Sequence, residues 1–214
     1  DYNNYVPHLY GAINSVLLNA DEDDSFSFYV LTANLSKKNR NLLGQFNQRE
    51  NCSLNIIDID EKLFSQFPLT KECPHISIAT YYRYVLAEVI PDVDKLIYLD
   101  CDLNVLSSLK PLYEVDISDD AIAGVQDILC KENSERLNIE KYINAGVMLI
   151  NLDYWRKNDV KTKLFEYTTE NFSKIVWQDQ DVLNVVLQDK IKYIDKKWNA
   201  QSKIGRAVQQ ECRD

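Results

Sequence analysis

The stretch Lys95-Leu96-Ile97-Tyr98-Leu99-Asp100-Cys101-Asp102 decides both the expected fold and the expected site. Its first part is mostly apolar and rich in β-formers, which is typical of a buried β-strand. Two carboxylates, Asp100 and Asp102, follow directly. In an open α/β sheet the ligand crevice lies beyond the carboxyl ends of the strands, so acids in this place are expected to face a ligand. Hard divalent cations take oxygen ligands, so the pair predicts a metal site that leaves coordination positions free for a diphosphate.

The Asp-x-Asp spacing by itself is a weak signal, because the chain holds 21 aspartates. One competing pair lies in a run of four acidic residues, which is most simply a solvated loop. Another follows Pro91 and precedes the strand, at the wrong end of the sheet, whereas a third ends the apolar run 54–57 and stays a real alternative. A solvated strand end would also explain the chosen pair, so spacing and flanks leave the metal assignment open. The competing pairs are, in that order, Asp21/Asp23, Asp92/Asp94 and Asp58/Asp60, and Asp179/Asp181 has the same spacing.

The composition fits one domain that can bury a sizeable core, since 45% of the 214 residues are hydrophobic. The 33 acidic and 24 basic residues give a net charge of −9, which argues against nucleic acid or an anionic membrane as a general partner. No apolar run approaches the roughly 20 residues of a membrane span, and no signal region stands at the N-terminus. We expect no transmembrane segment and a cytoplasmic location, with peripheral attachment at the inner face of the membrane left open.

The cysteines and histidines do not form a metal or disulfide pattern. There are five cysteines, an odd number that is widely spread and includes no Cys-x-x-Cys pair. A zinc cluster or a disulfide framework is therefore not expected. Only His8 and His75 could add imidazole ligands, and neither lies near a cysteine in the sequence.

Strand-like and helix-like segments alternate along the chain. This alternation predicts an α/β fold with a mostly parallel central sheet covered by helices. Because a helix comes before the first strand, we expect that a first strand is missing from the chain. The domain is expected over residues 1–197, with 198–214 as a tail of uncertain structure. The expected strands are 25–32, 54–59, 95–99, 121–125, 143–152 and 191–194, and the expected helices are 8–19, 36–48, 81–89, 153–172 and 178–187.

Five ordered blocks carry a family resemblance. They are Asn4-Tyr5-Val6-Pro7-His8-Leu9, His75-Ile76-Ser77 with Thr80-Tyr81-Tyr82-Arg83, Lys95 to Asp102, Tyr142 to Leu152 with Trp155, and Gln178-Asp179-Gln180-Asp181-Val182-Leu183-Asn184. With similar separations, these blocks resemble glycosyltransferase family 8, the retaining GT-A enzymes that include bacterial lipooligosaccharide galactosyltransferases and glycogenin. The resemblance covers most of residues 1–200.

The resemblance implies a GT-A, Rossmann-like fold and a retaining hexosyltransferase. The donor would be UDP-galactose or UDP-glucose, and the acceptor a hydroxyl group of a glycan, a lipooligosaccharide or a glycoprotein. The resemblance also implies Mn²⁺, with Mg²⁺ as the alternative, bound by Asp100 and Asp102 against the donor diphosphate. A dication there stabilises, as a Lewis acid, the negative charge that develops on the β-phosphate oxygen when UDP departs.

The resemblance assigns further residues to the nucleotide part of the donor. Arg83 would add cationic hydrogen bonds to the diphosphate or the sugar, the alternative being a surface arginine on an amphipathic helix. Asp1 and Asn4 fall in the family loop that holds the uridine, although the spacing around Asp1 differs from the family pattern. Cys101 would offer its backbone to the ribose, and its thiol is expected to be a small buried filler.

Three residues are assigned to the donor sugar. Asp127, at a strand end, would bind sugar hydroxyls, and capping of a helix or turn is the alternative. Asn144 matches a family asparagine that faces the sugar, whereas a buried asparagine that satisfies strand-edge amides is a rival explanation. Ala145, the next residue, is assigned to the same site.

Asp179 and Gln180 are the candidate catalytic residues. A retaining transfer passes through an oxocarbenium-like centre and needs either an enzyme nucleophile on the far face of the anomeric carbon or attack by the acceptor from the front face. The neutral amide oxygen of Gln180 is a poor nucleophile, so front-face substitution with electrostatic help from both residues is the preferred mechanism. The structural alternative is an acidic helix start with Asp179 near the cap.

Two departures from the family pattern keep other functions open. Family members usually supply a third metal ligand, a histidine, and a phosphate-binding lysine in a late His-x-x-Gly-x-x-Lys-like segment, whereas this chain has no histidine beyond His75 and is expected to lack the first strand. We expect either that the chain lacks segments of the native protein or that metal and diphosphate binding are weakened. The absent histidine favours a degenerate, non-catalytic sugar-nucleotide-binding module as one alternative. A sugar nucleotidyltransferase is the other, because such enzymes also gather carboxylates at strand ends around Mg²⁺. They typically begin with a Gly-rich phosphate loop, which a chain with five glycines does not show.

Overall fold

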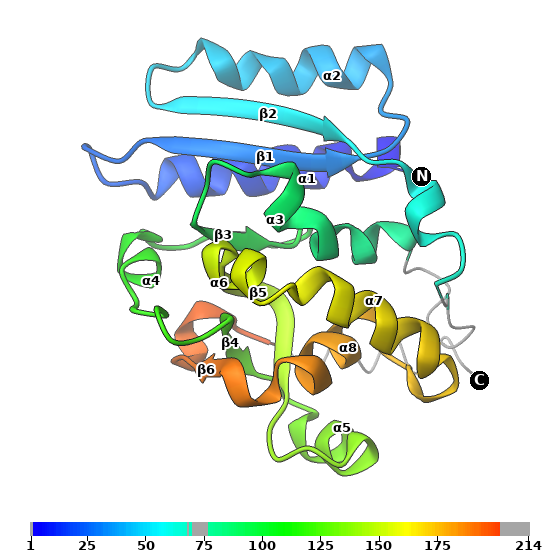
Figure 1. The fold of residues 1–214 in the computed structure, drawn as a ribbon. Helices are drawn as coiled ribbons and strands as arrows, with labels where there is room; N and C mark the ends of the chain where they lie inside the picture. Colours follow the sequence, from blue (N-terminus) through cyan, green and yellow to red (C-terminus); the bar gives the residue numbers. More distant parts are fainter. Residues whose placement is uncertain (1, 68, 70–76, 202–214) are drawn as a thin grey trace, which may run out of the picture. The chain divides into compact units, whose positions relative to one another are not determined.

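The computed structural model, drawn in Figure 1, describes residues 2–67, 69 and 77–201. The chain divides into two compact units. The described residues form a two-stranded sheet in the first unit and a four-stranded sheet in the second. Unit 1 comprises Asp1–Leu63 and Leu99–Val115, and unit 2 comprises Phe64–Tyr98 and Asp116–Asp214.

Unit 1 is built on two parallel strands, β1 (Phe26–Thr32) and β2 (Cys52–Asp58), paired from Phe26↔Cys52 to Thr32↔Asp58. Alternate residues of a strand point to one face, and here that face packs against α1 (Tyr2–Leu18) and α2 (Lys37–Gly44). Both helices run alongside the sheet in Figure 1. The buried core consists of Val6, Ile13, Leu35, Leu43, Phe46, Cys52 and Leu54. Shorter helices are η1 (Gln45–Gln48), η2 (Glu61–Phe64) and α4 (Lys110–Tyr113).

Unit 2 is built on a four-stranded sheet in the order β3-β5-β4-β6. β4 pairs with β6 in parallel and with β5 in antiparallel orientation. β4 and β5 consist largely of buried residues, which is typical of strands covered on both faces. The strands are β3 (Lys95–Leu99), β4 (Ile122–Gln126), β5 (Ile143–Asn151) and β6 (Ile191–Tyr193).

Aromatic side chains join two of the helices of unit 2. Phe165 of α7 packs edge-on against Phe67, with ring centroids 4.8 Å apart, and Phe67 packs edge-on against Tyr81 of η3 at 5.0 Å. The helices of this unit are η3 (Ile78–Val85), α3 (Leu86–Val89), α5 (Cys130–Leu137), α6 (Leu152–Lys157), α7 (Val160–Glu170), η4 (Phe172–Lys174), α8 (Gln178–Val186), η5 (Gln188–Lys190) and η6 (Lys196–Trp198).

The predicted α/β architecture is confirmed, but the direction of one strand differs from the prediction. The pairs β1–β2 and β4–β6 are parallel, as predicted, but β5 runs antiparallel to β4, so the larger sheet is mixed. A buried strand has the same apolar pattern whichever way it runs, so the sequence could not supply this direction. The segment between β4 and β5 contains helix α5, which was not predicted. After this segment the chain runs back along β4 as β5.

The helix boundaries show three further differences. α1 begins at Tyr2 instead of residue 8, with Pro7 inside it, because burial of its apolar face outweighs the hydrogen bond that Pro7 removes. The predicted helix 81–89 is a 3₁₀ helix that becomes α-helical only at Leu86. The predicted helix 153–172 is interrupted at Asp159, which adopts a left-handed conformation with φ of 48°.

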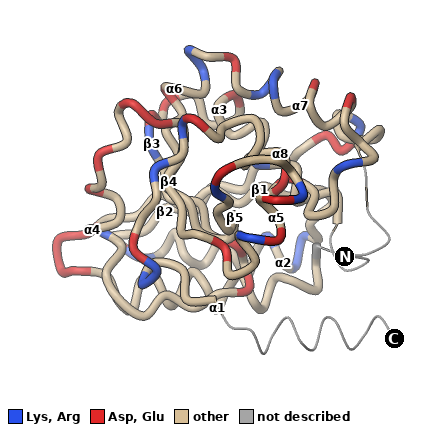
Figure 2. Tube along the Cα trace, turned by 90° about the horizontal axis from the view of Figure 1, so that it is seen from below, with Lys and Arg blue, Asp and Glu red and all other residues tan. Residues whose placement is uncertain are grey.

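Charged residues are spread widely along the trace. In Figure 2 the Lys and Arg residues are scattered among acidic ones over many elements. Within the described part of the chain, no helix has both the length and the apolar character that a membrane crossing needs.

Replacing Gly124 of β4 by Ala is expected to destabilise the protein by about 1–3 kcal/mol. A Cβ atom at this position would lie 2.6 Å from Cδ1 and 3.3 Å from Cβ of Ile143, a fully buried side chain with little room to move. Gly11→Ala in α1 is the matched control, because nothing lies within 4 Å of its added methyl group. We expect this control to be neutral or to stabilise by about 0.5–1 kcal/mol. Urea unfolding of both variants measures the difference, and equal stability would contradict the packing argument.

Candidate functional site

The main candidate site lies in unit 2, where β4 ends and β5 and α8 begin. Asp127 directly follows β4, Asn144 and Ala145 lie in the first part of β5, and Asp179 and Gln180 lie in the first turn of α8. The backbone N–H of Asp127 donates to the carbonyl of Tyr142 at 2.9 Å, which brings the end of β4 to the start of β5. Side chains from three segments distant in the sequence therefore meet in one place.

Ala145 is the point at which two predicted site residues meet. Its backbone N–H donates to Oε1 of Gln180 at 2.9 Å, and its carbonyl accepts from Nη1 of Arg83 at 2.8 Å. Asn184, one turn further along α8, binds the backbone of Ile143 in the same way, through its Oδ1 at 2.7 Å and its Nδ2 at 2.9 Å. Polar side chains of α8 thus hold the first part of β5 by its backbone.

Asp127 belongs to the same cluster through its carboxylate. Its side chain is only 3% exposed. Oδ1 accepts from the backbone N–H of Leu129 at 2.7 Å, while Oδ2 accepts from Nδ2 of Asn144 at 2.9 Å and from Nε2 of Gln180 at 3.4 Å. The alternative role of Asp127 as a turn cap is therefore present, and its second oxygen links it to two other candidate residues.

Asn144 is half-buried and uses both ends of its amide group. Besides donating to Asp127, it accepts at Oδ1 from the backbone N–H of Gly146 at 3.0 Å and from Nδ2 of Asn199 at 2.8 Å. The bond to Gly146 agrees with the alternative explanation, in which this asparagine binds a backbone amide of the strand. The bonds to the side chains of Asp127 and Asn199 go beyond it.

Arg83 and Asp179 form a buried ion pair. Both side chains are 5% exposed, and Nε of Arg83 lies 3.0 Å from Oδ2 of Asp179. The guanidinium group also lies over the ring of Tyr98, with 4.1 Å between Cζ and the ring centroid, and Thr80 donates a hydrogen bond to Oδ1 of Asp179. The alternative of a surface arginine is therefore wrong, because Arg83 is enclosed by η3, β3 and α8.

Burial raises the pKa of Asp179 above its ordinary value, and the Arg83 charge and the Thr80 hydroxyl offset part of this rise. The neighbouring acid Asp181 is 0% exposed and fully bonded. Its Oδ1 accepts from Arg136 at 2.7 Å and Tyr142 at 2.6 Å, and its Oδ2 from the backbone N–H groups of Val176 at 2.8 Å and Trp177 at 3.0 Å. These bonds fix the turn into α8, where Gln178 has a left-handed φ of 35°.

Sequence reasoning gave no role to several residues that complete this cluster. Thr80, Tyr142 and Asn184 all stand inside the quoted blocks, yet nothing in a single sequence shows which polar residues of a block face inward. A polar residue inside an otherwise apolar strand or helix is the signal that could have directed attention to them.

The predicted metal pair lies in unit 1, directly after β3. Asp100 is half-buried and Asp102 is exposed. Burial, together with the negative charges of Asp102 and Asp100, raises the pKa of the Cys101 thiol to about 11, so this thiol is protonated at neutral pH. Two carboxylates suit a hard cation such as Mn²⁺ or Mg²⁺. Within residues 2–67, 69 and 77–201, no group of three or more potential metal-binding side chains comes together, so the pair fits a cation as a partial site.

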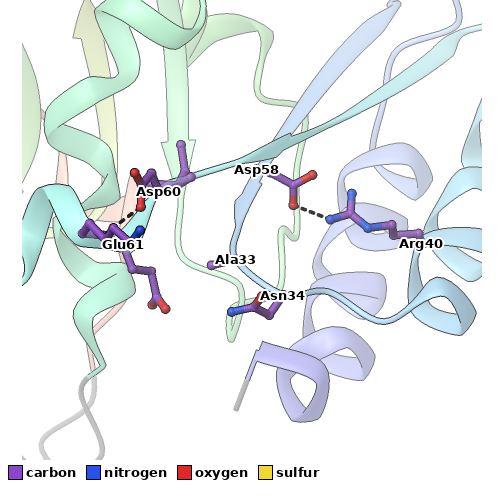
Figure 3. A pocket seen from close by; sticks show the side chains of 8 residues that line it. Ala33, Asn34, Arg40, Asp58, Asp60 and Glu61 are labelled. Carbon is purple, nitrogen blue, oxygen red and sulfur yellow. Dashed lines mark hydrogen bonds and ion pairs between the residues drawn. The ribbon is translucent and has the colours of Figure 1, made fainter.

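The competing pair Asp58/Asp60 lines a pocket of about 490 Å³ at the carboxyl ends of β1 and β2 (Figure 3). Asp58 is ion-paired with Arg40, and Oδ1 of Asp60 accepts from the backbone N–H of Lys62 at 3.0 Å. A cation on Asp58 would have to compete with a guanidinium group, which disfavours this pair as a metal site. The lining residues are Ala33, Asn34, Arg40, Asp58, Ile59, Asp60, Glu61 and Lys62.

The described part of the predicted uridine loop is helical. Asn4 is exposed and lies in the first turn of α1, so its placement in a loop is wrong. Asp1 lies outside the described residues, as do His75 and the region 202–214.

Comparison with known proteins gives consistent matches. Residues 2–214 match the family model described as glycosyl transferase family 8. General stress protein A of Bacillus subtilis is 30% identical over 208 residues, which cover 94% of this chain and 72% of that protein. Lipopolysaccharide 1,3-galactosyltransferase of Salmonella typhimurium is 28% identical, with coverage of 89% and 58%. The crystal structure of the galactosyltransferase LgtC with donor and acceptor sugar analogues is similar with a TM-score of 0.81 and 33% identity, covering 91% of this chain and 71% of that one.

The chain spans between 46% and 72% of the length of three curated relatives that it matches. It therefore corresponds to part of those proteins.

Replacing Asp179 by Asn is expected to change how stability depends on pH. Because the folded state holds the Asp179 proton above the ordinary pKa of 3.8, it binds more protons than the unfolded chain just above that pH. Stability from this group therefore falls as the pH rises from 3.8 to the raised folded value. The stability of the wild type minus that of Asp179→Asn should shrink over this interval.

Urea unfolding between pH 4 and pH 7 measures the effect. Asp153→Asn is the control, because that exposed carboxylate is paired with Lys157, one helical turn further along α6. A difference between wild type and Asp179→Asn that stays constant or grows with pH would contradict the assigned direction.

Proposed function

The chain belongs to glycosyl transferase family 8, and from this premise we propose that it is a retaining hexosyltransferase that uses a UDP-sugar donor. In this proposal galactose or glucose moves to a hydroxyl group of a glycan or lipooligosaccharide acceptor. Two of the relatives support the acceptor class by name, one as a lipopolysaccharide 1,3-galactosyltransferase and one as a lipopolysaccharide 1,2-glucosyltransferase. We place the transferase domain at residues 1–197.

One observation carries the proposal. Six of the residues selected from the sequence belong to a single connected network of polar contacts. The path runs from Asp179 to Arg83, through the backbone of Ala145 to Gln180, and on to Asp127 and Asn144. Buried polar groups cost stability unless they are hydrogen-bonded, and among the described residues Oδ2 of Asp179 has no hydrogen bond although it is ion-paired with Arg83. A polar network that carries such a cost at strand and helix ends favours a binding role.

The sugar-binding role rests on chemistry and exposure together. Sugar hydroxyls both donate and accept, and Asp127 offers a carboxylate acceptor beside the donor groups of Asn144 and Gln180. Asn144 and Gln180 are half-buried, so they stand between the enclosed Asp127 and solvent. We assign these residues to the donor sugar and Ala145 to the floor of the same site.

The proposed catalytic contribution of α8 is electrostatic. Oε1 of Gln180 is already engaged by the Ala145 N–H, which agrees with front-face attack by the acceptor better than with attack by this oxygen. Asp179 contributes negative charge close to a developing oxocarbenium ion, and Arg83 contributes positive charge on the side of the departing diphosphate. Because Arg83 is bonded to Asp179 and Ala145, it also fixes the distance between these two contributions.

The carboxylates of Asp100 and Asp102 are proposed to bind Mn²⁺, or Mg²⁺ in its place. The bound cation would stabilise, as a Lewis acid, the negative charge that develops on the UDP β-phosphate. Asn4 and Asp1 keep their proposed role toward the uridine.

UDP release from UDP-galactose or UDP-glucose in the presence of Mn²⁺ tests the proposal directly. Release that depends on the sugar nucleotide supports the transferase. Turnover of a nucleoside triphosphate with a sugar phosphate would identify a nucleotidyltransferase instead. UDP binding without any release, with added acceptor glycan as well, would identify a non-catalytic binding module.

Asp102→Asn is expected to weaken Mn²⁺-dependent UDP binding at least about tenfold, equivalent to about 1.4 kcal/mol. The reason is that the amide has lost the charge that attracts the cation, whereas the exposed side chain has no core role. Asp60→Asn is the matched control, since it removes an acid at the end of another strand and should change the affinity less than about twofold. Titration calorimetry with UDP, with and without MnCl₂, measures both, and unchanged affinity in Asp102→Asn would refute the metal site.

A further inference from the structure

The hydroxyl group of Tyr142 lies between Asp181 and Gln180. It donates to Oδ1 of Asp181 at 2.6 Å, and it accepts from Nε2 of Gln180 at 3.2 Å. Tyr142 is fully buried and stands immediately before β5. No role follows for it from the family motifs quoted above, although it touches a candidate catalytic side chain.

The donor and acceptor roles at this hydroxyl are fixed. An ionised carboxylate only accepts hydrogen bonds, so the Tyr142 proton points to Asp181. Burial and the Asp181 charge also raise the pKa of Tyr142 well above its ordinary value, which keeps the proton in place. Toward Gln180 the hydroxyl therefore presents only a lone pair.

Three neighbours then determine the orientation of the Gln180 amide group. The backbone N–H of Ala145 can only donate, so it selects the oxygen end at 2.9 Å. The Tyr142 lone pair and the Asp127 carboxylate select the nitrogen end, at 3.2 Å and 3.4 Å. The terminal torsion of a glutamine is broad, so these bonds and not rotamer preference set the direction of the amide.

We propose that Tyr142 is a positioning residue that holds the Gln180 amide in its reactive orientation, with Asp181 as the group that fixes the Tyr142 proton. The inference rests on the proposed function, in which Gln180 acts at the donor sugar. In this proposal Asp181 acts on Gln180 only through Tyr142, because its two oxygens already accept four hydrogen bonds.

Tyr142→Phe separates this role from a structural one. The variant leaves the nitrogen of Gln180 with Asp127 at 3.4 Å and leaves Asp181 with Arg136 and two backbone N–H groups, so the turn into α8 should persist. Tyr84→Phe is the matched control, because Tyr84 is also fully buried and its hydroxyl contacts Thr168 at 3.4 Å.

The first measurement needs no activity. In the ¹⁵N NMR spectrum of the full protein, the side-chain amide signal of Gln180 is identified by its loss in Gln180→Glu. We expect its protons to exchange with solvent at least about fivefold faster in Tyr142→Phe and at the wild-type rate in Tyr84→Phe. An unchanged rate in Tyr142→Phe, or an equal change in both variants, would overturn the proposal.

The second measurement is turnover of the UDP-sugar. We expect kcat to fall about tenfold in Tyr142→Phe while KM for the donor changes less than about twofold, because the lost hydrogen bond orients a reacting group. Tyr84→Phe should keep both constants within about twofold of the wild type. A rise in KM with unchanged kcat would overturn the positioning role. If the wild type releases no UDP, the proposed function fails, and the exchange rates still decide whether Tyr142 orients Gln180.

Discussion

The backbone of Ala145 is the constraint on which the site in unit 2 depends. Its N–H is bound by Gln180 and its carbonyl by Arg83, so one peptide unit fixes the two polar side chains relative to each other. Arg83 also forms a buried ion pair with Asp179, and Nε2 of Gln180 donates a hydrogen bond to Oδ2 of Asp127. A buried charge without its partner would cost several kcal/mol, so Arg83 and Asp179 are expected to stay paired. The start of β5 therefore serves as the frame for the candidate chemistry.

The same arrangement explains why neighbouring acids of one block can differ in role. Asp179 faces Arg83 and Thr80, and burial raises its pKa, while the Arg83 charge and the Thr80 hydroxyl offset part of this rise. Asp181 receives four hydrogen bonds and holds the turn into α8. Gln180, between them, is held through Tyr142, Ala145 and Asp127. Structural residues thus alternate with candidate catalytic residues at the start of α8, and the structural ones hold the candidate ones in place.

The sequence predicted the fold and the family more completely than the site. Strands such as 95–99 and 143–152 were found because β-branched and aromatic runs identify buried strands, and the family assignment is confirmed by the match over residues 2–214. The antiparallel direction of β5 and the early start of α1 could not be found, because tertiary packing decides both. The sequence also did not show which polar residues are buried. Arg83 was compatible with a surface position, and nothing but its place in an apolar block pointed to Tyr142. Hydrogen-bond partners depend on which segments of the chain lie side by side in the fold, and the pattern of a single sequence does not show this.

The central claim is that the network around Ala145 faces the sugar of a UDP-hexose. A crystal structure of the protein with Mn²⁺ and a non-transferable UDP-2-fluoro-hexose tests it most directly. The account predicts sugar hydroxyls within hydrogen-bonding distance of Asp127 and Asn144, with the Gln180 amide still bound to the Ala145 N–H. A sugar bound away from these side chains, with the nucleotide well ordered, would contradict it.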